Sequence, residues 1–291
     1  MRSVKYMDDA TIQETIDLKT AVVYDSVKIL PSDNSLLQNE ITILKQISDQ
    51  REMKLNCAKT KLFIANFSVN YQFKPMLKIP GQNSPIETID ETKLLGYWLT
   101  ENMKPDTHVN FIVGKCYQRI WAVRKLKTAG IQPEDILKFY FTNIRSVLES
   151  SCQVFHSMLT VDDKQEIERI QKIVLRIALG SQYSSYEDAC DLMNIESLDS
   201  RRQQLSLKFA LKLLDSHQHK DMFQFTEKSN LLLRHQPILK VPFAHTTRYM
   251  DSPLPSLTRI LNDFFDRKIL EGDLINIPSR FFPIVNLENG L

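Results

Sequence analysis

The local pattern of the chain changes abruptly near residue 102, and this change constrains the fold more than any other feature. Before it, short β-prone runs and one helical segment are separated by turn residues. After it, apolar residues recur at helical spacing through several consecutive segments. Because strands followed by helices are typical of segregated architectures, the sequence predicts an α+β fold. We expect an α+β region at residues 1–102 and a helical body after it.

The first region begins with a predicted β-hairpin. β-prone or apolar residues flank Asp8 and Asp9 on both sides, so these two carboxylates should lie at the hairpin tip. Ser35 then opens a helix with one apolar stripe, made of Leu37, Ile41, Leu44 and Ile47. Further β-prone runs cover residues 20–30, 62–67, 73–79 and 93–99, with turn residues between them.

Residues beyond 105 predict consecutive amphipathic helices. The first covers residues 107–127 and ends at Gly130, the second begins at Pro133 and the third at Thr160. Ser185 and Ser197 can each cap a further helix. The expected core faces are Val109, Ile112, Cys116, Ile120 and Val123; then Ile136, Tyr140, Ile144 and Val147; then Ile167, Ile170, Val174 and Ile177; and finally Leu198, Leu205, Phe209 and Leu213.

The chain beyond residue 217 has a weaker pattern. Its prolines predict an extended segment before a final helix at residues 257–265; they are Pro237, Pro242, Pro253 and Pro255.

Composition excludes several classes of protein. The 43% hydrophobic and 25% charged residues are typical of a globular chain, and a net charge of +2 does not by itself require a nucleic-acid partner. The seven glycines lie too far apart for a phosphate-cradling loop, which excludes Walker, Rossmann and nucleophile-elbow motifs. Four separated cysteines indicate buried thiols of a reducing compartment. Without an apolar leader or membrane span, we expect an intracellular protein, nuclear or cytoplasmic and not secreted.

The adjacent carboxylates Asp8 and Asp9 suggest metal chemistry. Carboxylate oxygens are natural ligands of Mg²⁺, and two such ions about 4 Å apart can activate an attacking hydroxyl and stabilise a leaving oxygen. An Asp-Asp turn between strands is also ordinary loop chemistry. The order of the segments that follow decides between these two interpretations.

The sequence Tyr6-Met7-Asp8-Asp9 resembles the acidic box of the reverse-transcriptase palm, and later segments extend the likeness. A lysine-bearing segment follows at residues 55–61, and a Leu-Gly strand at residues 93–99 is similar to the hairpin that grips the primer end. Residues 144–149, 167–172 and 200–202 resemble phrases of the same family. Over residues 1–265 the chain resembles the C-terminal part of a reverse transcriptase from a non-LTR (LINE-type, jockey-like) retrotransposon.

This resemblance implies a fold and an activity. Residues 1–102 would be the C-terminal half of the palm, residues 103–180 the helical thumb, and residues 181–291 a helical extension with an irregular tail. The parent activity is RNA-directed DNA polymerisation with Mg²⁺ as the cofactor. The implied partner is an RNA or DNA template–primer, with neither a membrane nor a small-molecule cofactor.

The resemblance also implies roles for single residues. Asp8 would hold a catalytic metal with Asp9 beside it, and Lys59 or Lys61 would approach the departing pyrophosphate. The implied primer contacts are Tyr6, Met7, Gly96 and Tyr97. Ordinary exposed lysines on a strand edge are the alternative interpretation of Lys59 and Lys61.

A basic cluster in the first long helix is a candidate phosphate contact. Between residues 115 and 127 it has five cations and no acid: Lys115, Arg119, Arg124, Lys125 and Lys127. A solvated helix face is the alternative. Tyr117 and Trp121 lie among these cations and could stack on bases or belong to the core. The pair Arg201 and Arg202 is a weaker candidate.

The family's palm needs a further aspartate on a strand upstream of the hairpin, and fingers residues upstream hold the incoming nucleotide. Met1 lies only a few residues before Tyr6, so we expect a 5′-truncated copy that is inactive alone and retains at most weak, residual template–primer binding through the thumb. One alternative is that Met1 is an incorrect start of a complete enzyme. Another is a non-enzymatic helical scaffold that binds a protein partner.

Overall fold

The structure is a computed structural model. It describes residues 2–6, 9–13, 22–24, 27–29, 36–53, 55–65, 72–73, 76–226 and 237–270. Side chains are described in these ranges except before residue 37 and at residues 72, 73, 220 and 268–270.

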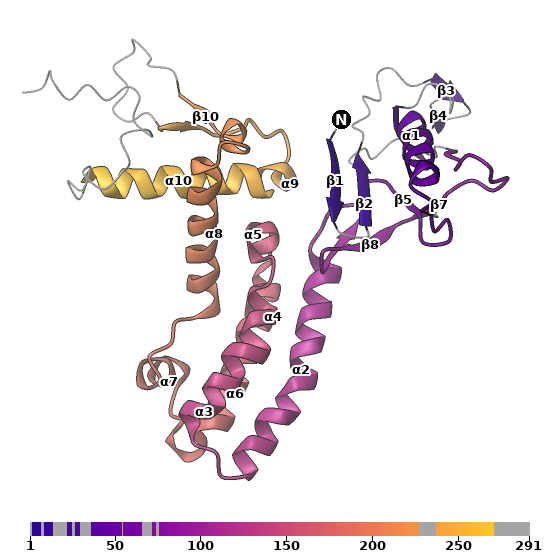
Figure 1. The fold of residues 1–291 in the computed structure, drawn as a ribbon. Helices are drawn as coiled ribbons and strands as arrows, with labels where there is room; N and C mark the ends of the chain where they lie inside the picture. Colours follow the sequence, from indigo (N-terminus) through magenta and orange to yellow (C-terminus); the bar gives the residue numbers. More distant parts are fainter. Residues whose placement is uncertain are drawn as a thin grey trace, which may run out of the picture. The chain divides into compact units, whose positions relative to one another are not determined.

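The protein has the predicted α+β class and is mostly helical, with small sheets (Figure 1). It divides into two units, which we call the N-terminal unit (residues 1–107) and the helical unit (residues 108–291). The expected division into palm, thumb and extension stays a prediction.

The predicted acidic hairpin is present. Strand β1 (Arg2–Tyr6) pairs with β2 (Asp9–Gln13) in antiparallel register, with Tyr6 opposite Asp9. The two residues between the strands, Met7 and Asp8, lie outside the described residues. Asp9 therefore begins the second strand, next to the turn, as the sequence predicts.

In the rest of the N-terminal unit, the described residues form one helix and several short strands. Helix α1 (Leu36–Gln50) confirms the helix expected after Ser35. The strands are β3 (Val22–Tyr24), β4 (Val27–Ile29), β5 (Lys61–Phe63), β6 (Gln72–Phe73), β7 (Glu87–Ile89), β8 (Glu91–Leu94) and β9 (Tyr97–Thr100). Strand β3 pairs with β4, and β8 with β9, in antiparallel register. Two parallel pairings, β4 with β6 and β5 with β7, join strands far apart in the chain.

A tight turn joins β8 to β9. Its two residues, Leu95 and Gly96, have φ angles of 49° and 90°. Two successive positive φ angles are typical of the two-residue hairpin turns that match the twist of antiparallel strands, and glycine adopts them at no steric cost. The Leu-Gly sequence therefore forms the tip of a hairpin.

The helical unit follows the predicted order of helices. Ser185 and Ser197 are N-caps, as expected: their hydroxyls accept hydrogen bonds from the backbone of Asp188 and Ser200. The helices are α2 (Asp106–Thr128), α3 (Pro133–Tyr140), α4 (Ser146–Glu149), α5 (Cys152–Phe155), α6 (Val161–Leu179), α7 (Tyr186–Leu192), α8 (Leu198–Asp215), α9 (Thr247–Met250) and α10 (Pro253–Leu270). Strands β10 (Gln224–Phe225) and β11 (Leu239–Lys240) form a small antiparallel pair.

The second predicted helix contains a π-helical segment, residues Phe141–Arg145, between α3 and α4. Its buried row is Ile136, Tyr140, Ile144 and Leu148. Val147, which the sequence assigns to this row, is only partly buried, and the fully buried Leu148 continues the row instead.

Helix α8 also departs from its predicted core face. Its buried residues recur at every fourth position, as Leu198, Arg202, Ser206, Ala210 and Leu214. Phe209, expected in the core, is 37% exposed. Small and polar residues on the buried face allow other helices to lie close to α8, and an apolar pattern does not reveal such a face.

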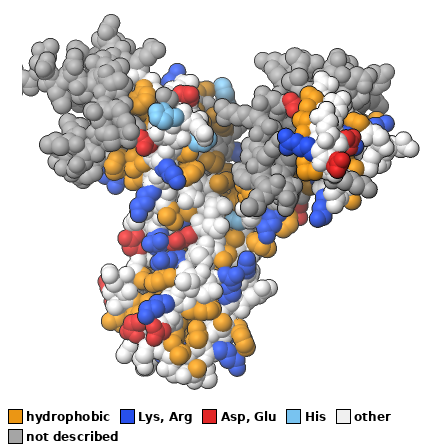
Figure 2. Space-filling view, viewed as in Figure 1, with side chains coloured by type: hydrophobic (Ala, Val, Ile, Leu, Met, Phe, Trp, Pro, Cys, Tyr) orange, Lys and Arg blue, Asp and Glu red, His pale blue; other side chains and the backbone are white. Residues whose placement is uncertain are grey.

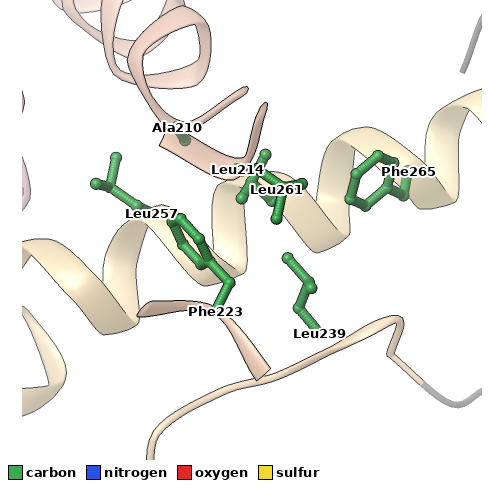
Figure 3. Close-up of a cluster of buried hydrophobic side chains, with 7 residues drawn as sticks. All are labelled: Ala210, Leu214, Phe223, Leu239, Leu257, Leu261 and Phe265. Atoms are coloured by element: carbon green, nitrogen blue, oxygen red, sulfur yellow. The ribbon is translucent and has the colours of Figure 1, made fainter. Parts of the chain in front are cut away.

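Helix α10 crosses the end of α8 over a compact apolar cluster (Figures 1 and 3). Leu257, Leu261 and Phe265 of α10 pack with Ala210 and Leu214 of α8, together with Phe223 and Leu239. The side-chain amide of Asn262 bonds both the amide and the carbonyl of Leu239 at 2.9 Å, which ties β11 to the helix. The prediction that Pro253 and Pro255 belong to an extended segment is wrong, because both residues lie in the first turn of α10.

Within the described part of the chain, no helix combines the length and the apolar character needed to cross a bilayer.

Candidate nucleic-acid interface

The structure describes the backbone of the hairpin strands. Tyr6 and Asp9 lie opposite each other in the strand register, while their side chains and all of Met7 and Asp8 lie outside the described atoms. Among the side chains that are described, no group of three or more His, Cys, Asp or Glu could hold a metal ion. The Mg²⁺ site stays a prediction.

The two candidate lysines differ in their surroundings. Lys59 is exposed in the turn before β5. Lys61 begins β5, and its ammonium forms an ion pair with Glu87 at the start of the neighbouring strand β7. An ion pair across the edge of a small sheet is consistent with a structural use of Lys61, while Lys59 keeps an exposed charge.

The Leu-Gly hairpin exposes its tip and buries its second strand. Leu95 is 64% exposed beside Gly96, whereas Tyr97 is only 8% exposed. Burial, together with the Asp106 carboxylate, raises the pKa of Tyr97 to about 12, so its phenol stays protonated. The turn is therefore the part of this hairpin that a ligand can reach.

The five cations of α2 divide into two groups. Lys115, Arg124 and Lys125 are exposed. Arg119 donates to the backbone carbonyl of Asn143, and Lys127 donates to the carbonyl of Ala178 at 2.8 Å. The first group is free to meet phosphates, and the second group also fastens α2 to its neighbours.

The two aromatic residues among these cations separate in the same way. The Tyr117 hydroxyl donates to Glu166 of α6 at 2.6 Å, and its side chain is partly buried. Trp121 is 65% exposed. Of the two alternatives for Trp121, the core is therefore excluded and the surface position remains.

One exposed face of α2 combines aromatic, basic and amide side chains. At 3.6 residues per turn these side chains fall within about a third of the helix circumference. We call them the α2 stripe: Phe111, Lys115, Gln118, Trp121 and Lys125.

The charges of the stripe are not balanced on its own helix. Beyond Asp106 at its start, α2 contains no acidic residue. The Lys115 ammonium lies 5.9 Å from the centre of the Phe111 ring, and the Lys125 ammonium lies 5.7 Å from the centre of the Trp121 ring. These contacts hold the lysine stems against the helix and leave their charges at the surface.

The opposite face of α2 fixes the direction of the stripe. Its buried residues include all five that the sequence assigns to the core: Val109, Ile112, Cys116, Ile120 and Val123. Burial of this row in the helical unit leaves the α2 stripe on the solvent side. The periodicity of α2 thus sets which residues a ligand can reach.

The second basic pair is engaged in contacts within the helical unit. Arg201 donates to both carboxylate oxygens of Glu149, at 2.5 and 3.3 Å, and Arg145 lies 3.7 Å from the same carboxylate. Arg202 is fully buried, with its guanidinium beside Asp199 and His156. Arg202 is therefore closed to a phosphate, and the Arg201 charge is paired with Glu149.

Glu168 organises a polar network that the sequence did not predict. Its carboxylate accepts hydrogen bonds from the Tyr186 hydroxyl and from the backbone amides of Leu198 and Asp199. These are the first amides of α8, so the carboxylate caps that helix from α6. The three family-like segments of the helical region therefore meet around structural ion pairs and caps.

A second exposed basic row lies on α6. Arg169, Lys172 and Arg176 are spaced by three and four residues and are all exposed. Lys172 lies over Tyr186 and Arg176 over Tyr183, with 4.9 and 5.2 Å to the ring centres. The helical spacing of the three cations was a signal for this row. In the view of Figure 2, basic side chains are spread along the helical unit between hydrophobic ones.

A scan against protein-family models gives no match, and neither does a search of curated proteins or of solved structures.

Proposed function

We propose that this chain is part of a reverse transcriptase of the non-LTR retrotransposon class and that it binds a template–primer through the α2 stripe. The observation that carries the proposal is the exposed face of α2, where two lysines and two aromatic rings lie together on a helix with no acidic residue beyond Asp106. The order of acidic hairpin, helix, Leu-Gly hairpin and helical unit supports it. Residues 1–102 would then be palm, residues 103–180 thumb and residues 181–291 an extension.

The parent chemistry would be two-metal nucleotidyl transfer. Asp8 and Asp9 would contribute carboxylates to the Mg²⁺ ions, which supply charge stabilisation when bound. Each ion requires about six oxygen ligands, so the family's upstream aspartate is needed as well. Primer extension by the chain and by Asp8→Asn tests this assignment. Extension that Asp8→Asn abolishes would support it, and extension that this variant leaves unchanged would reject Asp8 as a metal ligand.

Phosphate contact by the stripe predicts a specific salt dependence. Each phosphate neutralised releases counterions, so the logarithm of affinity falls with the logarithm of salt by about 0.7 to 0.9 per contact. Lys115, Arg124 and Lys125 are the exposed cations of α2. If all three contact phosphates, the slope contributed by α2 is roughly −2 to −3.

Fluorescence anisotropy with a labelled template–primer, measured across a salt series, tests this interface. The variant Lys115→Ala/Lys125→Ala should weaken binding and reduce the slope by about 1.5. Lys138→Ala is the matched control, because Lys138 is an exposed lysine on α3 that is paired with Asp135 at 2.8 Å. Equal losses in the control and the double variant would reject α2 as the interface.

A protein-binding scaffold is the second candidate function. The segment before α10 exposes several large apolar side chains, among them Phe243 (79%), Tyr249 (44%) and Met250 (42%). Such side chains are common at protein interfaces. If the chain does not bind the template–primer, or if its affinity does not change with salt, this candidate is favoured.

A further inference from the structure

We propose that the α2 stripe binds unpaired nucleotides, so that it engages the single-stranded part of a template–primer and not the duplex. This inference rests on the proposed nucleic-acid function and specifies its ligand. Its basis is the combination of an outward Trp121 ring with lysines on the same face of α2.

The exposure of Trp121 is the first step. An indole is one of the largest apolar groups in a protein, and its burial strongly favours folding or binding. Here 65% of the residue remains open to solvent, and its ring lies 5.7 Å from the Lys125 ammonium. A ring left in this position offers exposed aromatic surface to a ligand.

The stripe repeats one two-residue arrangement. Phe111 and Lys115 are four residues apart, and so are Trp121 and Lys125; in each pair the ammonium lies over the ring, at 5.9 and 5.7 Å. The two rings are ten positions apart, a rise of about 15 Å along the helix. Each pair thus presents one surface for stacking and one charge, with the exposed amide of Gln118 between them.

This arrangement fits bases that are not paired. In a duplex the base faces stack on one another, and a protein meets only edges, sugars and phosphates. In a single strand the faces are accessible, and grooves that bind such strands combine aromatic rings with cations. A stripe built for a duplex backbone alone would need the lysines and not the rings.

The test compares oligo-dT of about 12 nucleotides, within the range of known single-strand sites, with a blunt duplex of the same length. Binding to the intact chain is followed by anisotropy and by tryptophan emission. We expect the single strand to bind more tightly than the duplex and to quench tryptophan emission. Trp121→Phe should lose the quench and keep most of the affinity.

Two alanine variants separate stacking from charge. Trp121→Ala should weaken single-strand binding by roughly 5- to 150-fold without changing the salt slope. Lys125→Ala should instead lower the slope by about 0.7.

Phe243→Ala provides the matched control, since Phe243 is another exposed aromatic residue but lies outside α2. It should leave binding unchanged. Tighter binding of the duplex, with no effect of Trp121→Ala, would overturn the stacking inference and leave phosphate contact by α2 intact. Failure of both oligonucleotides to bind would overturn the proposed function and this inference together.

Discussion

His156 and Arg202 form a buried pair of basic residues in the helical unit. His156 is 7% exposed and Arg202 is fully buried, and the Arg202 Nε lies 3.4 Å from His156 Nδ1. Because an imidazole nitrogen accepts a hydrogen bond only when it carries no proton, this contact requires neutral His156. Burial first, and the Arg202 charge second, lower the pKa of His156 to about 4.

The stability of the protein should therefore fall in mild acid. The pKa of His156 is near 6.5 in the unfolded chain and about 4 in the folded one. Protonation thus favours the unfolded state, and stability present above pH 6.5 is lost as the pH falls towards 4. Between pH 7.5 and pH 4.5 we expect a loss of about 2–3 kcal/mol from this residue, measured by urea unfolding.

His156→Gln isolates this contribution, because glutamine is polar but does not titrate in this range. Its stability should change less between the two pH values than that of the wild type. An identical pH dependence in the variant would show that other groups cause the acid sensitivity.

At the scale of the element, the buried row between α3 and α5 follows one of two helical spacings. Positions three and four residues after Ile144 both lie on its face of a helix, so Val147 and Leu148 are both candidates for the core. Leu148 is fully buried, whereas Val147 is only partly buried. The row therefore continues at the four-residue spacing, directly after the π-helical segment at residues 141–145.

Alanine substitutions distinguish these two arrangements. Leu148→Ala should destabilise the protein by about 2–5 kcal/mol, since it removes a fully buried leucine and leaves a cavity. Val147→Ala is the matched comparison and should cost about 1 kcal/mol or less. Chemical denaturation of both variants measures the difference, and a larger effect of Val147→Ala would show that Val147, and not Leu148, fills the core.

At the scale of the whole molecule, the helical unit contains its own core and its own caps. Its buried residues come from α2 through α10, and its polar network joins α6 to α8 through Glu168. Domains with a separate core can fold alone. We therefore expect a fragment of residues 103–291 to unfold cooperatively.

Circular dichroism during urea unfolding tests this expectation. A single sigmoidal transition of the helical signal is the expected result, and Leu148→Ala should shift its midpoint to lower urea. A gradual loss of signal would show that the helical unit needs the N-terminal unit to fold.

The sequence by itself determined the local features of this protein. The acidic hairpin, the N-caps Ser185 and Ser197 and the core face of α2 all follow from turn residues, capping side chains or apolar spacing. These features depend on residues only a few positions apart, so their signals can be read along the chain. The basic cluster of α2 was found for the same reason.

Only the tertiary structure decided how the polar and aromatic side chains are used. The buried Arg202 has its partner His156 in another helical segment. Arg119 and Lys127 likewise bond carbonyls of other helices. Trp121 faces solvent, whereas smaller residues such as Val109 and Ile112 make up the buried face of α2. The free energy of burying a charge or a ring depends on partners distant in sequence, and periodicity along one helix carries no information about them.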